Sequence, residues 1–311
     1  MWSKIVKLIA HSFLISFIVR QSKRIILPGF EKLPLYDVAV FFWDSIMKGS
    51  LTMRASAVAF SFFLAMFPSI IFIFTLIPYI PIANFQDQLL DLMKNFMPSH
   101  AYEAARETIE DIVKNQHGGL LSVGFISALY FSTNGFNALI TAFNATYHTI
   151  ETRSAFKQRM ASLYLVGIST LLMLSAITLI IVSEVALLKI FKQGEVLYYL
   201  ILCGRWMIVF ALFYFLISFT FYLGPVRKSG WRFFSAGSML GTILTIITSV
   251  GFAYYVNNFG NYNKLYGSIG TLIVVLLWIY FNSLVVLLGF DLNASIHGAK
   301  RDKESSATPT V

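Results

Sequence analysis

The chain has 311 residues, of which 57% are hydrophobic and 13% are charged, and its formal net charge is +9 at pH 7. The charged share is about half of that in a typical soluble domain, and the apolar residues form runs that are too long for the helices of a soluble core. The composition therefore excludes an ordinary soluble fold. Because basic residues flank the apolar runs, we interpret the positive charge as directed toward lipid headgroups rather than nucleic acid.

Residues 1–50 are predicted to form amphipathic helices at the cytoplasmic membrane interface. The apolar stretch from Trp2 to Val19 is short, and it is followed by basic residues without a small-residue cleavage site. These features favour an uncleaved interfacial helix over a secretory signal. A second helix is expected at about 35–47, where aromatic and acidic residues alternate around the helix.

Six stretches are long and apolar enough to cross a hydrocarbon layer of roughly 30 Å. They cover about residues 57–82, 119–146, 162–188, 198–223, 235–258 and 268–296. Seventeen lysine and arginine residues fall in segments on one side of the predicted membrane, and six fall on the other. Basic residues favour the cytoplasmic side. We therefore expect an all-α, six-span membrane domain over residues 51–297, with both termini in the cytoplasm.

The segment 84–118 between the first two spans is the one sizeable element predicted outside. Apolar residues recur there at helical spacing on both sides of Pro98, which predicts two short amphipathic helices. The acidic residues of the second helix are interpreted as a solvent-exposed face that is partly paired with Arg106 and Lys114. No metal site is therefore predicted there. The tail 298–311 is expected to be disordered.

Polar side chains within the spans are informative because hydrocarbon disfavours them unless they find a partner or a wet cavity. The second span carries one polar stripe and the sixth carries a second group of polar residues. The candidate residues are Asn134, Asn137, Thr141, Asn144, Asn282, Asp291 and Asn293. They are predicted either to line a polar path or to join helices by hydrogen bonds, and both interpretations stay open.

Two ion pairs are predicted near the ends of the spans. Arg54 and Asp291 both lie near the inner surface, where they are expected to form a latch. Glu184 and Arg205 lie at similar depth across the short connection between the third and fourth spans. The alternative for these charges is a purely structural bridge, or side chains that extend separately to the interface.

Several motifs, taken in order and spacing, resemble the YihY/virulence factor BrkB family of six-span bacterial inner-membrane proteins. The resemblance covers roughly residues 40 to 297. The matching stretches include Arg54-Ala55-Ser56-Ala57, Asn134-Gly135-Phe136-Asn137-Ala138-Leu139, Pro225-Val226-Arg227, Tyr266-Gly267-Ser268-Ile269-Gly270, Trp278-Ile279-Tyr280 and Leu288-Gly289-Phe290-Asp291-Leu292-Asn293-Ala294. The family more usually has Gly-Ala-Glu-Leu-Asn-Ala at the last stretch, where this chain has Phe290 and Asp291.

The resemblance implies a six-span fold in the bacterial inner membrane. Some members of the family are suspected to transport solutes or to export lipids. Members have also carried the name ribonuclease BN, but the chain has no histidine cluster for the metal that such an activity needs. Nor does it have a phosphate-binding glycine loop ending in Lys-Ser or Lys-Thr.

We therefore expect a non-enzymatic protein, without cofactor or ATPase, that moves a lipid or amphipathic solute. The alternative is a non-transporting scaffold that engages an envelope protein through its acidic outer helices. Membrane lipids are the expected partners, nucleic acid is not, and no oligomeric state is predicted.

Overall fold

The computed structural model describes residues 20–26, 29–30, 33–48, 50–80, 84–96, 99–146, 153–190, 196–226, 233–259 and 262–307. In these ranges the regular elements are helical, which confirms the predicted all-α class. They are α3 (Leu35–Lys48), α4 (Leu51–Leu76), the short 3-10 helix η1 (Ile77–Tyr79), α5 (Phe85–Phe96), α6 (Ser99–Lys114), α7 (Gly118–Thr146), α8 (Ala155–Ile190), α9 (Val196–Leu223), α10 (Ala236–Phe259) and α11 (Tyr262–Ala307). The interfacial helix predicted at 2–19 lies outside the described residues.

Five described helices are long and apolar enough to cross a membrane: α4 continued by η1, α8, α9, α10 and α11. The second predicted span is the 29-residue helix α7, which is not among these five. Its asparagines explain the difference, because each amide lowers the hydropathy of the helix. The count of six spans and the side of the membrane on which each terminus lies stay predictions.

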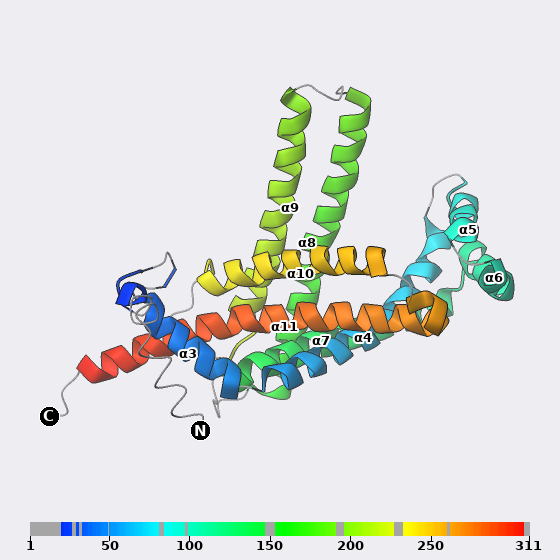
Figure 1. Cartoon of the computed structure of the whole chain (residues 1–311). Helices are drawn as coiled ribbons and strands as arrows, with labels where there is room; N and C mark the ends of the chain where they lie inside the picture. The colour runs from blue at the N-terminus through cyan, green and yellow to red at the C-terminus, as the bar shows by residue number, and fades with distance from the viewer. Residues whose placement is uncertain are drawn as a thin grey trace.

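The long helices fall into two groups that run in different directions. α4 packs along α7, α10 packs along α11, and α11 joins the two pairs by contacting α4. In Figure 1 these four helices run across the view, whereas α8 and α9 form a hairpin that projects away from them. Length and hydropathy do not divide the six stretches into two groups, but in the structure they do not form one parallel set.

The main core lies where α4, α7, α9 and α11 meet. The rings of Phe143 and Phe290 are stacked with their centroids 4.0 Å apart, and the ring of Phe221 meets Phe290 edge-on at 5.6 Å. These three side chains are almost completely buried. Close approach of α4 and α7 needs a glycine at position 135, since a Cβ there would lie 2.7 Å from the ring of Phe62. Phe290, which stands where the resembling family more usually has alanine, is thus the centre of an aromatic core.

The α8–α9 hairpin contacts the other helices at its base, where α8 packs on α7, α9 packs on α10, and Phe221 of α9 enters the aromatic core. Ile217 and Phe221 lie in the part of α9 that meets α10, because a Cβ on Gly241 of α10 would lie 3.5 Å from each of these side chains. Farther along, large apolar side chains are exposed on both helices, for example Leu171 at 67% and Met207 at 67%. A helix that is apolar on every face and exposed is typical of a surface that contacts hydrocarbon.

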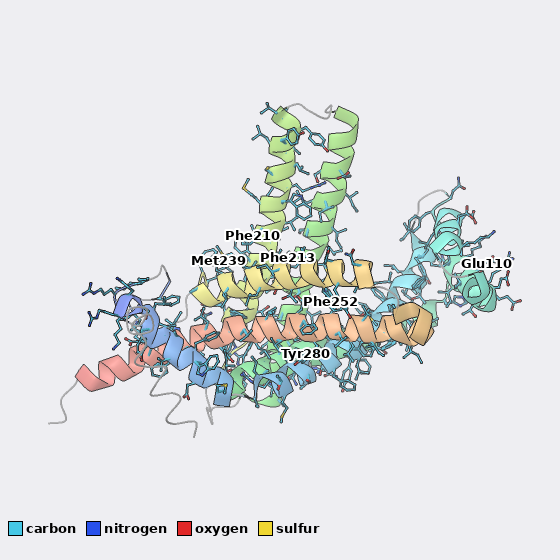
Figure 2. The ribbon with its side chains drawn as sticks, viewed as in Figure 1. Glu110, Phe210, Phe213, Met239, Phe252 and Tyr280 are labelled. Atoms are coloured by element: carbon cyan, nitrogen blue, oxygen red, sulfur yellow. The ribbon has the colours of Figure 1, made fainter. Side chains whose placement is uncertain are left out.

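The segment between α4 and α7 forms the two helices predicted there, α5 and α6. They dock on the end of α4 through a small cluster centred on Ile77, Leu90 and Val113. Figure 2 shows Glu110 of α6 at the edge of the molecule, away from the other long helices.

Two helices extend beyond the predicted segments. α4 begins at Leu51, before the span predicted at about 57–82, so Arg54 lies within the helix. α11 continues to Ala307, so residues 298–307 are helical where the sequence predicts a disordered tail. Packing against α3 explains the extension, because Ala299 is buried in a cluster that includes Val38 of α3.

Candidate functional site

A buried ion pair joins α4 to α11 across the core. Arg54 Nη2 lies 2.8 Å from Asp291 Oδ2, and Arg54 Nη1 donates a longer hydrogen bond of 3.3 Å to Asp291 Oδ1. The arginine side chain is 8% exposed and the aspartate is 0% exposed. The two residues predicted to pair therefore form a bidentate contact, a geometry that suits a guanidinium and a carboxylate.

α7 completes this cluster, which we call the Arg54 cluster and define as Arg54, Ala142, Thr146 and Asp291. Arg54 Nη1 donates to the carbonyl of Ala142 at 3.0 Å and to Thr146 Oγ1 at 2.5 Å. Thr146 Oγ1 in turn donates to Asp291 Oδ1 at 2.8 Å. The threonine hydroxyl thus accepts from the arginine and donates to the aspartate. One set of contacts fixes α4, α7 and α11 relative to each other.

Asn293, two residues after Asp291 on α11, holds the start of α10. Its Oδ1 accepts from the backbone N–H of Gly237 at 2.8 Å, and its Nδ2 donates to Ser235 Oγ at 2.8 Å. The two helices touch closely here, since a Cβ on Gly237 would lie 2.1 Å from the carbonyl oxygen of Gly289. Asn293 thus satisfies an N–H that the first turn of a helix leaves free, and it is 4% exposed.

Asn144 lies on the same helix as Thr146 but serves a different contact. Its Oδ1 accepts from the backbone N–H of Val226 at 3.0 Å, just beyond the end of α9. Arg153 covers the same end of α9 and donates to the carbonyls of Leu223, Gly224 and Pro225. Burial lowers the pKa of Arg153 below its usual value, yet the cation suits a helix C-terminus, where carbonyls lack partners.

The rest of the predicted stripe on α7 is occupied by the first turns of α8. Arg159 donates to Asn134 Oδ1, and its guanidinium lies 4.6 Å from the centre of the Tyr130 ring. Gln158 Nε2 donates to Asn137 Oδ1 at 2.6 Å and to Thr141 Oγ1 at 3.3 Å. These amides therefore join α7 to α8 in the conformation described.

The remaining candidates also make helix–helix contacts. Asn282 of α11 accepts from Ser249 of α10 at 3.2 Å and donates to the carbonyl of Trp278 at 2.8 Å. Arg205 of α9 lies 2.5 Å from Glu184 of α8, as the sequence predicts, with exposed fractions of 11% and 54%. This second pair is much more accessible than the Arg54 cluster, so water or headgroups can screen it.

In the conformation described, the polar candidates thus make contacts between helices, and their part in lining a path stays a prediction. Sequence reasoning missed five of the side-chain partners: Thr146, Gln158, Arg159, Ser235 and Ser249. Gln158 and Arg159 stand just before the predicted third span, where Arg159 counts only as a charge that sets orientation. The four-residue separation of Thr146 from Ala142 is the helical spacing that places both on the face of α7 near Arg54.

The sequence profile of the virulence factor BrkB family matches residues 42–310. The chain belongs to this family. A ribonuclease-like protein of Bacillus subtilis, YfkH, is 31% identical to this BrkB-family chain over 251 residues, which are 80% of the chain and 90% of that protein. In the part of the chain that the structure describes, no group of three His, Cys, Asp or Glu residues is placed to hold a metal ion.

Other relatives of this BrkB-family chain carry names that state only a membrane location. The UPF0761 membrane protein Smlt0865 of Stenotrophomonas maltophilia is 26% identical over 265 residues, or 82% of the chain. The UPF0761 membrane protein XCC0860 of Xanthomonas campestris is 25% identical over 290 residues, or 86% of the chain. The chain spans 60% and 63% of the lengths of these two proteins. No solved structure matches the chain.

Proposed function

We propose that this multi-pass membrane protein resides in the bacterial inner membrane and moves a lipid or amphipathic solute, without ATPase or other enzymatic activity of its own. The observation that carries the proposal is the Arg54 cluster. Charges inside membrane helices are costly and mark ion or substrate pathways in membrane proteins. A buried ion pair also adds little to stability compared with apolar residues of the same size. The Arg54–Asp291 pair is therefore better explained by a role in function than by packing alone.

In the conformation described, the cluster is closed, because Asp291 is 0% exposed. A path along the predicted polar residues opens only when α11 separates from α4 and α7 at this end. Two features favour such a movement. Pro68 within α4 removes one backbone hydrogen bond from that helix, and the close contact between Gly237 and Gly289 lets α10 and α11 move together as one unit.

The test uses purified protein reconstituted in vesicles that contain a fluorescently labelled phospholipid. We expect label to move between leaflets faster than in empty vesicles, and we expect Asp291→Asn to lower the rate about tenfold, a change of about 1.4 kcal/mol in the barrier. Glu110→Gln, at an exposed pair on α6, is the matched control and should leave the rate unchanged. Movement no faster than in empty vesicles, with Asp291→Asn equal to the unmodified protein, would contradict the proposal.

A second candidate is a non-transporting scaffold, and one observation favours it. The polar residues that would line a path are engaged with neighbouring helices, while α6 presents exposed carboxylates at Glu103, Glu107 and Asp111. A scaffold would engage an envelope protein through these carboxylates. Replacing all three by glutamine would then abolish the cellular function but leave lipid movement in vesicles unaffected, whereas the Asp291→Asn variant would retain the cellular function.

A further inference from the structure

An apolar cavity of about 460 Å³ lies between the end of α4 and the amphipathic helix α6. Phe74 and Thr75 of α4, Ile109 and Ile112 of α6, and Leu120 of α7 are among its lining residues. Its volume lies within the range of sites that bind small organic ligands. None of the seven polar residues predicted to line a path belongs to its lining, so the cavity is separate from the Arg54 cluster.

The lining offers no hydrogen bond to a ligand. Its one polar residue, Thr75, is 1% exposed and turns its hydroxyl toward the carbonyls of Ile71 and Phe72 in its own helix. The cavity therefore suits a purely apolar group. Water gains no hydrogen-bond partner from this lining, whereas an apolar group gains contacts with the surrounding side chains.

The cavity is continuous with the apolar outer surface of the long helices. Ile70 and Ile71, which also line it, are 42% and 45% exposed, and Leu120 is 41% exposed. A group that enters from this surface comes from the hydrocarbon phase and not from water. We propose that the cavity binds one hydrocarbon chain of a membrane lipid, which fills the space between α4 and α6 and holds the α5–α6 pair against the membrane domain. This inference does not depend on transport.

The experiment uses the full-length protein in vesicles of phosphatidylethanolamine and phosphatidylglycerol that contain a phospholipid with a photoreactive diazirine on its acyl chain. After illumination, mass spectrometry locates the labelled peptides. We expect labelling of α6 and the end of α4 to exceed that of the exposed face of α8 near Leu171 about tenfold, because a chain bound in the cavity stays in contact with its lining. Equal labelling at the two places would overturn the proposal.

Variants that fill the cavity separate specific binding from general contact with lipid. Ile112→Trp places a large ring in the cavity and should abolish the excess labelling at the end of α4, as should the milder Ile109→Phe. Val123→Trp adds the same bulk at a position on α7 that is 63% exposed, and it should leave the labelling unchanged. Circular dichroism and gel filtration establish that each variant is folded. Unchanged labelling in folded Ile112→Trp and Ile109→Phe proteins would refute the site.

Discussion

Removing one member of the Arg54–Asp291 pair should be far more damaging than removing both. Asp291→Ala deletes an acceptor of three hydrogen bonds, at 2.8 Å and 3.3 Å from Arg54 and at 2.8 Å from Thr146. Arg54, which is 8% exposed, then keeps its hydrogen bonds to the carbonyl of Ala142 and the hydroxyl of Thr146 but loses the carboxylate that it meets at 2.8 Å. Loss of one partner from a buried pair costs about 3–5 kcal/mol, so we expect destabilisation of that size.

The double variant Arg54→Met, Asp291→Leu replaces both charges by apolar side chains of similar size. Such replacements are neutral or stabilising in other proteins, so the double variant should lie within about 1 kcal/mol of the unmodified protein. The two single changes would then be strongly non-additive. This result is also what separates stability from function, because a stable double variant that fails to move lipid shows that the charges serve transport.

The measurement is unfolding of the detergent-solubilised protein by added sodium dodecyl sulfate, followed by circular dichroism. Glu110→Ala is the control, since its partner Arg106 is 61% exposed and an exposed pair contributes at most about 1 kcal/mol. If Asp291→Ala and Glu110→Ala cost the same, or if the two single changes in the pair add up in the double variant, the pair is not the buried, coupled contact described here.

Two further substitutions test the packing around the cluster. Gly237→Ala should destabilise the protein by about 1–3 kcal/mol, because the added Cβ would lie 2.1 Å from the carbonyl oxygen of Gly289. Gly251→Ala in the same helix is the control, because nothing lies within 4 Å of an added Cβ there, and it should be neutral or stabilising by up to about 1 kcal/mol. If unfolding by dodecyl sulfate shows Gly251→Ala to be less stable than Gly237→Ala, the close approach of α10 and α11 is refuted. Phe290→Ala should lower the free energy of unfolding by about 3–5 kcal/mol in the same assay, because it removes a fully buried ring stacked at 4.0 Å on Phe143. A loss below about 1 kcal/mol would exclude a central role for that ring.

The sequence predicts the helices well because each one has a local cause. The long apolar runs become α4, α8, α9, α10 and α11, and the amphipathic spacing on either side of Pro98 becomes α5 and α6. The error at the C-terminus has a physical explanation. The polar composition after residue 298 suggests disorder, but α3 supplies a packing partner that lets α11 continue to Ala307.

The candidate site is only partly predictable. Arg54 and Asp291 stand out because each is a charge near the end of an apolar run, and their shared depth suggests that they pair. The partners of the stripe on α7 do not stand out, since Gln158 and Arg159 look like ordinary residues of a segment outside the membrane. Their contacts with Asn137 and Asn134 depend on how α8 leaves α7, and periodicity along one helix contains no information about that.

The amino-acid sequence by itself determines that this chain is helical, that it belongs in a membrane and that its polar residues occupy particular helix faces, because hydropathy and spacing are properties of each segment alone. The tertiary structure decides which faces meet. Asp291 meets Arg54 from 237 positions away, Gly237 meets Gly289, and the α8–α9 hairpin turns away from the other long helices (Figure 1). These arrangements arise from the fit of side chains between segments distant in the sequence, and that fit exists only once the helices are packed.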